Sequence, residues 1–160
     1  MAHTLILMRH GNAEKAQEGQ TDQERTLTSQ GLAALRSPSG VARTFSLLSQ
    51  HERETAALWA SPAVRAVQTA QTVAEAIGER PIITCDELWE QNPTAFMEKV
   101  RASDASTIIA VGHVPFVNGL TAALTSVKLK FKPGAAAAIA LGDTNEADPE
   151  KLLWFVQAAR

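Results

Sequence analysis

Two short apolar runs, each ending at a histidine, constrain the fold of this chain more than any other feature. Residues 5–8 lead directly into Arg9-His10-Gly11, and residues 107–111 lead into Gly112-His113. Such runs are typical of strands that are buried on both faces of a parallel sheet. Because parallel strands end at one edge of the sheet, where open α/β folds bind their ligands, we expect the two histidines to lie close together.

Strand-like and helix-like segments alternate along the remainder of the chain. Further strands are predicted over residues 57–60, 82–84, 135–141 and 152–156, and helices over residues 28–50, 63–77, 94–101 and 117–124. This alternation predicts an α/β fold, a three-layer α/β/α sandwich with a mostly parallel central sheet. The length of 160 residues favours one domain over residues 1–160.

Local signals refine these boundaries. Pro38 and Gly40 fall inside the first helical segment and predict a kink or a helix in two parts. Ser61-Pro62 predicts a capping residue followed by the first helical position, and Gly78 predicts the end of the same helix.

Three polar segments are expected at the surface. Residues 12–26 predict a loop and residues 142–150 a turn. The lysines at 128, 130 and 132 alternate with apolar residues, which predicts an edge strand with a charged face or a surface for an acidic partner.

Composition excludes several classes of partner. A net charge of −2, with 20% charged and 45% hydrophobic residues, offers no broad basic surface for nucleic acid or an anionic membrane. No apolar segment reaches the length of a membrane span or follows a signal-peptide pattern. Cys85 is the only cysteine, which excludes an internal disulfide and a multi-cysteine metal site and predicts a cytoplasmic location.

The ends of three predicted strands carry residues that suit a phosphoryl group. Arg9 and Arg65 supply guanidinium forks for phosphate oxygens, whereas His10 and His113 can attack phosphorus or carry a proton. Gly11 lets the backbone turn and approach closely. Taken singly, Arg65 is also consistent with a solvated helix residue and His113 with a structural histidine. Together they are enough to surround a tetrahedral dianion.

The same residues belong to three ordered motifs. These are Arg9-His10-Gly11 after a strand, Ser61-Pro62-x-x-Arg65-Ala66-x-Gln68-Thr69 in the middle, and Gly112-His113 after a late strand. The set resembles the histidine phosphatase superfamily, which includes the phosphoglycerate mutases and acid phosphatases. A further pattern, Asp22-x-x-Arg25-x-Leu27-Thr28-x-x-Gly31, resembles the small SixA-type phosphohistidine phosphatases. The resemblance covers nearly the whole chain and implies a phosphoglycerate mutase-like fold.

The resemblance implies a catalytic role for four of these residues. His10 would be the nucleophile, forming a phosphohistidine that water then hydrolyses. Arg9, Arg65 and His113 would hold the phosphoryl oxygens and stabilise charge in the transition state.

A second group of residues would help to bind the substrate. Arg25 would add a further positive group from the polar loop. Asn12 would donate an amide hydrogen bond to the same oxygens, unless it serves only as a turn residue, and Gly11 would let the backbone approach them. No metal or other cofactor is implied, because arginines take the place of Mg²⁺ in neutralising the phosphate charge.

The proton donor for the leaving group has more than one candidate. The superfamily commonly places a glutamate after the third strand in a Leu-x-Glu pattern, and Leu88-Trp89-Glu90 matches that spacing. Glu87 is a nearby rival. SixA-type members can dispense with this acid, because a phosphoramidate nitrogen can be protonated by other means.

These expectations define a function and its alternatives. The resemblance implies a phosphatase that hydrolyses phosphohistidine on a protein partner, with a small phosphomonoester as the second substrate class. A mutase is disfavoured because the short chain has little room for a lid that retains the phosphoryl group. The competing class is a non-catalytic phosphate-binding module.

Overall fold

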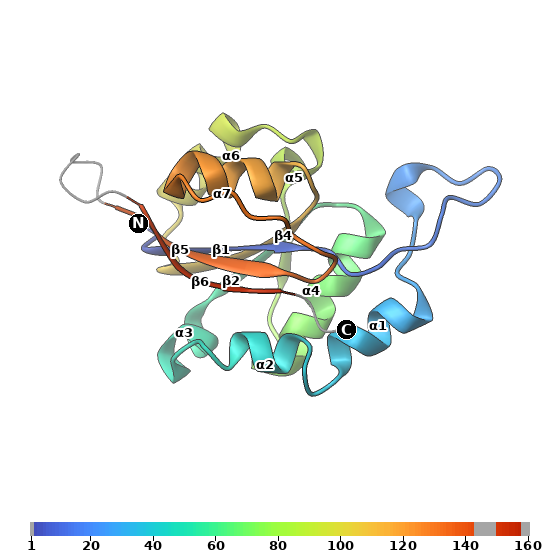
Figure 1. Cartoon of the computed structure of the whole chain (residues 1–160), viewed down its shortest axis with the longest axis horizontal. Coiled ribbons are helices and arrows are strands. Elements are labelled where there is room, and N and C mark those ends of the chain that lie inside the picture. Colours follow the sequence, from blue (N-terminus) through green and yellow to red (C-terminus); the bar gives the residue numbers. More distant parts are fainter. Residues whose placement is uncertain (1, 143–149, 158–160) are drawn as a thin grey trace.

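The computed structural model describes residues 2–142 and 150–157, and in this part of the chain a six-stranded sheet lies between two layers of helices (Figure 1). The strands are β1 (Thr4–Arg9), β2 (Ala57–Ala60), β3 (Ile82–Thr84), β4 (Thr107–Gly112), β5 (Ala136–Ala140) and β6 (Lys151–Val156). Their order across the sheet is β3-β2-β4-β1-β5-β6. Strands β1 to β4 are parallel, whereas β5 is antiparallel to β1 and β6 to β5. The predicted α/β sandwich with a mostly parallel sheet is confirmed.

Helices cover both faces of this sheet (Figure 1). Below it in the view lie α1 (Ser29–Arg36), α2 (Val41–Phe45), α3 (Gln50–Thr55) and α4 (Val64–Ile77). Above it lie α5 (Asp86–Glu90), α6 (Pro93–Ala102) and α7 (Phe116–Thr125). A short 3-10 helix, η1 (Asp22–Glu24), forms in the loop after β1. None of the described helices is long and apolar enough to cross a membrane.

Alternation along the central strands divides the core into two halves. In β1 the side chains of Ile6 and Met8 join the cluster under α1, α2 and α4, whereas Leu5 and Leu7 join the cluster under α5, α6 and α7. All four are fully buried. Because successive side chains of a strand point to opposite faces, a continuous apolar run is required when both faces are covered by helices.

The structure corrects several predicted boundaries. The segment predicted as a kinked or two-part helix forms two helices, α1 and α2, on either side of Pro38 and Gly40, and a further helix, α3, follows them. Ser61-Pro62 does not cap α4, because that helix begins at Val64 after Ala63. The helix α5 was not predicted at all.

The lysine-rich segment is also different from its prediction. Residues 127–132 form no strand, and the segment is anchored instead by Phe131, which is buried and packs edge-to-face on Phe155 at 5.3 Å. Of the polar turn predicted at 142–150, residues 143–149 lie outside the described residues.

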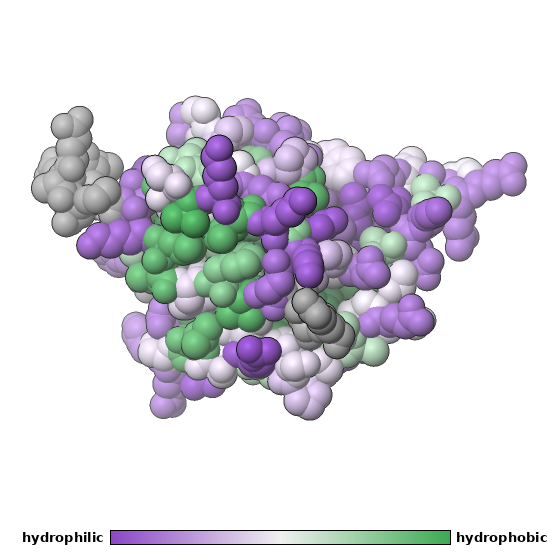
Figure 2. All heavy atoms as spheres, in the orientation of Figure 1, coloured by the Kyte–Doolittle hydropathy of each residue, from purple (hydrophilic) through white to green (hydrophobic). Residues whose placement is uncertain are grey.

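Apolar and polar side chains are unevenly distributed over the surface. Figure 2 shows apolar side chains gathered on the face that carries β6, where Leu153 is 54% exposed. The long loop after β1, at the opposite end of the view, is covered by polar side chains (Figure 2). That loop begins at the end of β1, directly after His10.

The first turn of α1 packs directly on this loop. The carbonyl oxygen of Asn12 accepts a hydrogen bond from the backbone N–H of Thr28, and the Thr28 hydroxyl caps the helix by accepting from Gly31. A Cβ atom on Gly31 would lie 2.4 Å from the Asn12 carbonyl oxygen. The close approach therefore requires glycine at this position.

We expect Gly31→Ala to lower the free energy of unfolding by about 2 kcal/mol or more, because the new methyl group collides with backbone and not with a flexible side chain. Urea denaturation measures the change. The matched control is Gly119→Ala in α7, where an added Cβ meets no atom within 4 Å. Alanine favours a helix by about 0.5–1 kcal/mol over glycine, so this control is expected to be neutral or stabilising. Equal effects of the two substitutions would contradict the proposed clash.

Candidate active site

Parallel pairing of β1 with β4 brings the two histidines together. Arg9 and Gly112 are paired in register, so His10 and His113 leave the sheet side by side. Their ring centroids are 5.1 Å apart, and the ring planes are inclined at 61°. Arg65 reaches the same place from the first turn of α4, the helix that follows β2. The three strand ends thus meet at one edge of the sheet, as the sequence predicts.

Two hydrogen bonds define the tautomer of His10. Nε of Arg65 donates to Nε2 of His10 at 3.3 Å, and a guanidinium can only donate. Nε2 is therefore unprotonated, and Nδ1 carries the proton, which it donates to the carbonyl oxygen of Gly11 at 2.7 Å. The imidazole presents a free electron pair on Nε2 at the point where Arg65 lies.

Burial keeps both imidazoles neutral. It lowers the pKa of His10 to about 4; the hydrogen bond to Gly11 raises this pKa, and the charge of Arg65 lowers it further. Burial also lowers the pKa of His113 to about 3, with smaller contributions from His10 and Arg65. At neutral pH, His10 is therefore an uncharged base with the electron pair that a nucleophile needs.

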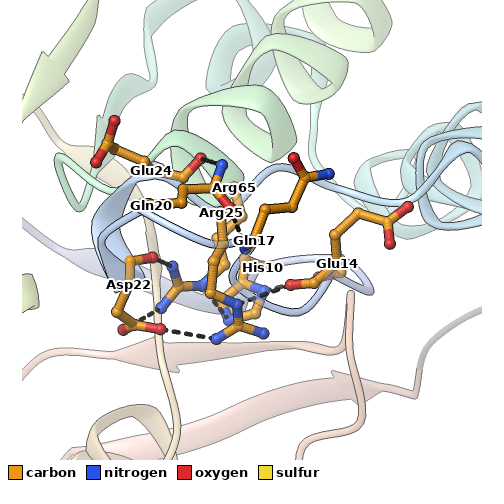
Figure 3. A network of polar contacts seen from close by, with 9 residues as sticks. His10, Glu14, Gln17, Gln20, Asp22, Glu24, Arg25 and Arg65 are labelled. Carbon is orange, nitrogen blue, oxygen red and sulfur yellow. Dashed lines mark hydrogen bonds and ion pairs between the residues drawn. The ribbon is translucent and has the colours of Figure 1, made fainter.

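Two arginines from different elements share one carboxylate beside His10 (Figure 3). Asp22 accepts from Nη1 of Arg25 at 2.8 Å and from Nη2 of Arg65 at 3.2 Å. Nη1 of Arg65 also donates to the carbonyl oxygen of Asp22 at 2.7 Å, and Nε of Arg25 donates to that of Glu14 at 2.7 Å. The hydrogen bond from Arg25 lowers the pKa of Asp22, so the carboxylate stays ionised. The carboxylate of Asp22 therefore bridges Arg25 and Arg65.

His113 is held by a hydroxyl on one side and an indole on another. Its Nε2 lies 2.8 Å from the hydroxyl oxygen of Ser61, a fully buried residue. The ring of Trp89 meets that of His113 edge-to-face, with centroids 5.5 Å apart. The same indole lies under the guanidinium of Arg65, whose Cζ is 5.8 Å from the ring centroid. Trp89 therefore forms a wall of the site.

Arg9 lies beside the histidines with an incomplete set of partners. Its Nη1 donates to the carbonyl oxygen of Phe131 at 2.9 Å. Its Nε is buried and has no hydrogen-bond partner in the part of the chain that the structure describes. A buried donor without a partner is costly, which makes this position suitable for an anionic oxygen.

The residues that follow His10 are fixed by the backbone. The N–H of Gly11 donates to the hydroxyl of Thr69 in α4 at 3.0 Å, which connects the end of β1 to the helix that carries Arg65. The side chain of Asn12 is exposed and makes no hydrogen bond to the described residues, while its carbonyl oxygen receives Thr28. The amide role predicted for Asn12 stays a prediction.

The two glutamates considered as proton donors occupy different environments. Glu87 forms an ion pair with Lys99 at 2.9 Å and accepts a hydrogen bond from the thiol of Cys85. The hydrogen bond from Lys99 lowers the pKa of Glu87, which makes it a poor acid. Glu90 is exposed at the end of α5, and its carboxylate makes no hydrogen bond or ion pair with any described residue.

Three contributions to the site escaped prediction from the sequence. The sequence places Trp89 only in the Leu88-Trp89-Glu90 pattern, predicts Ser61 as a helix cap, and includes Asp22 in a motif without giving it a role. The sequence does contain a signal for Ser61, because this serine directly follows a predicted strand. The two strands that end at His10 and His113 end at the same edge of the sheet, so Ser61 can reach a histidine. Thr69 likewise belongs to the motif that contains Arg65, and its hydroxyl accepts a hydrogen bond from the N–H of Gly11.

Two further features bear on what the site can bind. The described residues contain no cluster of three or more potential metal ligands among His, Cys, Asp and Glu side chains. A cavity of about 340 Å³ lies beside the loop after β1, between α1, α2 and the segment 132–134. It is lined by Gly11 and Asn12 but by neither histidine, so it adjoins the cluster around His10 without including either imidazole.

Histidines and arginines meet at the strand ends, and the sequence around them matches a known family. Residues 5–97 match the model of the histidine phosphatase superfamily (branch 1). The match spans more than half of the 160 residues, and the chain belongs to this superfamily. Comparison with curated proteins gave no match.

Solved structures share the fold over almost the full chain. A protein assigned as the phosphohistidine phosphatase SixA from Agrobacterium tumefaciens has a TM-score of 0.76 and 20% identity, with 98% of both chains covered. The protein histidine phosphatase SixA in complex with tungstate gives 0.74 and 21%, with 96% of both covered. A mutant phosphoserine phosphatase from Entamoeba histolytica, in complex with phosphoserine, gives 0.68 and 14%, with 95% of both covered.

Proposed function

We propose that this chain is a cytoplasmic phosphatase of the SixA type, which hydrolyses phosphohistidine on proteins through a covalent intermediate on His10. The observation that carries the proposal is the unprotonated Nε2 of His10, directed at Arg65 and 3.3 Å from its Nε. Membership of the superfamily supports phosphatase chemistry. The SixA neighbour in complex with tungstate, an oxyanion of phosphate-like shape, supports the choice of ligand.

The reaction divides into two displacements at phosphorus. In the first, the electron pair of His10 Nε2 bonds to phosphorus, the bond to the leaving nitrogen breaks, and that nitrogen takes a proton from solvent. In the second, a water oxygen attacks phosphorus and the bond to Nε2 breaks. Inorganic phosphate leaves with the hydrogen atoms of the water distributed between it and the solvent, and the neutral imidazole is restored.

The positive groups around His10 suit the developing charge on phosphorus. Arg65 donates from the side of His10, and Arg9 offers a buried Nε that lacks a partner among the described residues. Arg25 adds long-range attraction from the neighbouring loop. His113, neutral and held by Ser61, is placed to donate or accept one hydrogen bond at a phosphoryl oxygen.

The absence of a positioned acid in the described structure favours a phosphoramidate over an alkyl ester. An alkoxide leaving group needs a proton from the enzyme, whereas an imidazole leaving group departs readily at neutral pH. Glu90 is exposed and its carboxylate makes no hydrogen bond or ion pair with a described residue, so its role as the proton donor stays a prediction. Small phosphomonoesters remain the second candidate, because a phosphoserine phosphatase shares the fold.

Turnover of a phosphohistidine peptide, compared with p-nitrophenyl phosphate and 3-phosphoglycerate, tests the proposal. We expect kcat/KM to be at least about tenfold higher for the peptide, a difference of about 1.4 kcal/mol in transition-state binding. Glu90→Gln is expected to leave peptide turnover unchanged. A preference for either ester would favour the monoesterase, and binding of phosphate without turnover of any substrate would favour a phosphate-binding module.

A further inference from the structure

The edge of Arg65 that suits a phosphoryl group is already filled by the protein itself. Nε and Nη2 lie on one edge of a guanidinium and form the fork that binds two oxygens of a carboxylate or phosphate. In this structure Nε faces Nε2 of His10 at 3.3 Å, and Nη2 faces Oδ2 of Asp22 at 3.2 Å (Figure 3). Asp22 therefore occupies the place next to the nucleophile that an equatorial phosphoryl oxygen would take.

The two partners of this ion pair differ in how firmly they are held. The side chain of Arg65 is 5% exposed, whereas that of Asp22 is 56% exposed. Asp22 lies in η1, within a loop whose surface is polar (Figure 2). Its carboxylate is thus the member of the pair that can move into solvent at small cost.

Neither side chain would be left unpaired if the carboxylate moved. Arg65 keeps the hydrogen bond from Nη1 to the backbone carbonyl of Asp22, at 2.7 Å, and this contact does not depend on the side chain. Asp22 keeps its shorter contact to Arg25, at 2.8 Å. Arg25 is anchored in turn by the carbonyl oxygen of Glu14. The carboxylate can therefore exchange one arginine for solvent while it stays paired with the other.

We infer that Asp22 is an internal competitor of the phosphoryl group, a carboxylate that sets the affinity of the site for phosphate by occupying Nη2 of Arg65 whenever the site is empty. An incoming phosphoryl oxygen displaces it toward Arg25, and its return helps to expel the product. The inference rests on the proposed function for the identity of the ligand, but it concerns binding of an anion and not the chemical step.

The charges around His10 explain why such a competitor is useful. Arg9, Arg25 and Arg65 bring three positive charges near a neutral imidazole. A product dianion in this field would leave slowly, and product release often limits turnover. One negative charge beside Arg65 lowers the affinity for phosphate, while every group proposed to bind the phosphoryl oxygens is kept.

The affinity for inorganic phosphate, measured by isothermal titration calorimetry at pH 7 and low ionic strength, tests the inference. Asp22→Asn removes the charge and keeps the shape, and we expect its Kd for phosphate to fall roughly tenfold below that of the unmodified chain. Asp22→Glu, which restores the charge, is expected to move Kd back toward the original value. The difference should shrink at high salt, because exposed charges are screened.

The matched control is Glu14→Gln, which makes the same charge change in the same loop. The Glu14 carboxylate makes no hydrogen bond or ion pair with the described residues, and the carbonyl that holds Arg25 is retained, so Kd should stay within twofold. An unchanged or higher Kd in Asp22→Asn would overturn the inference, and a higher one would make Asp22 a positioning residue for Arg65. Binding is measured without turnover, so the two proposals can fail separately. If Asp22→Asn binds phosphate more tightly than the unmodified chain but the chain hydrolyses no substrate, the proposed function is overturned and the role of Asp22 as a competitor stands.

Discussion

Replacing His10 by alanine is expected to lower kcat on a phosphohistidine peptide by at least about 10⁴-fold, because it removes the Nε2 electron pair that attacks phosphorus in the proposed mechanism. His113, the nearest alternative at 5.1 Å between ring centroids, is tied to Ser61 through Nε2. Single-turnover mixtures quenched in base should yield a covalent phosphoryl adduct on the unmodified chain by mass spectrometry. The adduct should be absent from His10→Ala.

Two comparisons make this result specific to the nucleophile. His51→Ala changes an exposed histidine in α3, remote from the strand ends, and is expected to leave kcat unchanged. Phosphate should still bind to His10→Ala, because the arginines proposed to hold its oxygens are intact. If the variant kept activity within tenfold of the original, or if the adduct mapped to His113, His10 would lose its proposed role.

The position of the site followed from the sequence because it depends on strands with strong local signals. The apolar runs before His10 and His113 predict strands that are covered by helices on both faces. Parallel pairing of these two strands then places both histidines at the same edge of the sheet. Arg65 could be added because its helix begins just after a third strand. The placement of these residues is a consequence of sheet geometry, which short sequence patterns report well.

The contacts that refine the site depend on packing between segments, and the sequence does not report these. Trp89 lies in a helix of five residues, and which way such a short helix turns its side chains depends on what it packs against. Asp22 reaches Arg65 only because the long loop after β1 folds back on α4. The sequence predicts Ser61 as a cap because serine is a common residue before a helix. In the structure its buried hydroxyl is hydrogen-bonded to His113 instead.

Acid is expected to destabilise the protein well above the pH at which carboxylates titrate, because the fold keeps two imidazoles neutral, with His113 buried and His10 partly buried. In the unfolded chain a histidine has a pKa of about 6.5, whereas burial lowers the pKa of His10 to about 4 and that of His113 to about 3. Between these values the unfolded state binds more protons. The free energy of unfolding is therefore highest above pH 6.5 and falls as the pH decreases toward 4.

The loss can be measured by urea denaturation between pH 7 and pH 5, a window that lies above the lowered pKa of carboxylates such as Asp22 and Glu75. Each buried histidine contributes at most about 1.4 kcal/mol per pH unit, so we expect a total loss of roughly 2 to 4 kcal/mol. His113→Gln removes one titrating group and should reduce the loss by about half, whereas His51→Gln, at an exposed position, should not change it. A loss of the same size in His113→Gln would mean that His113 is not held neutral by the fold.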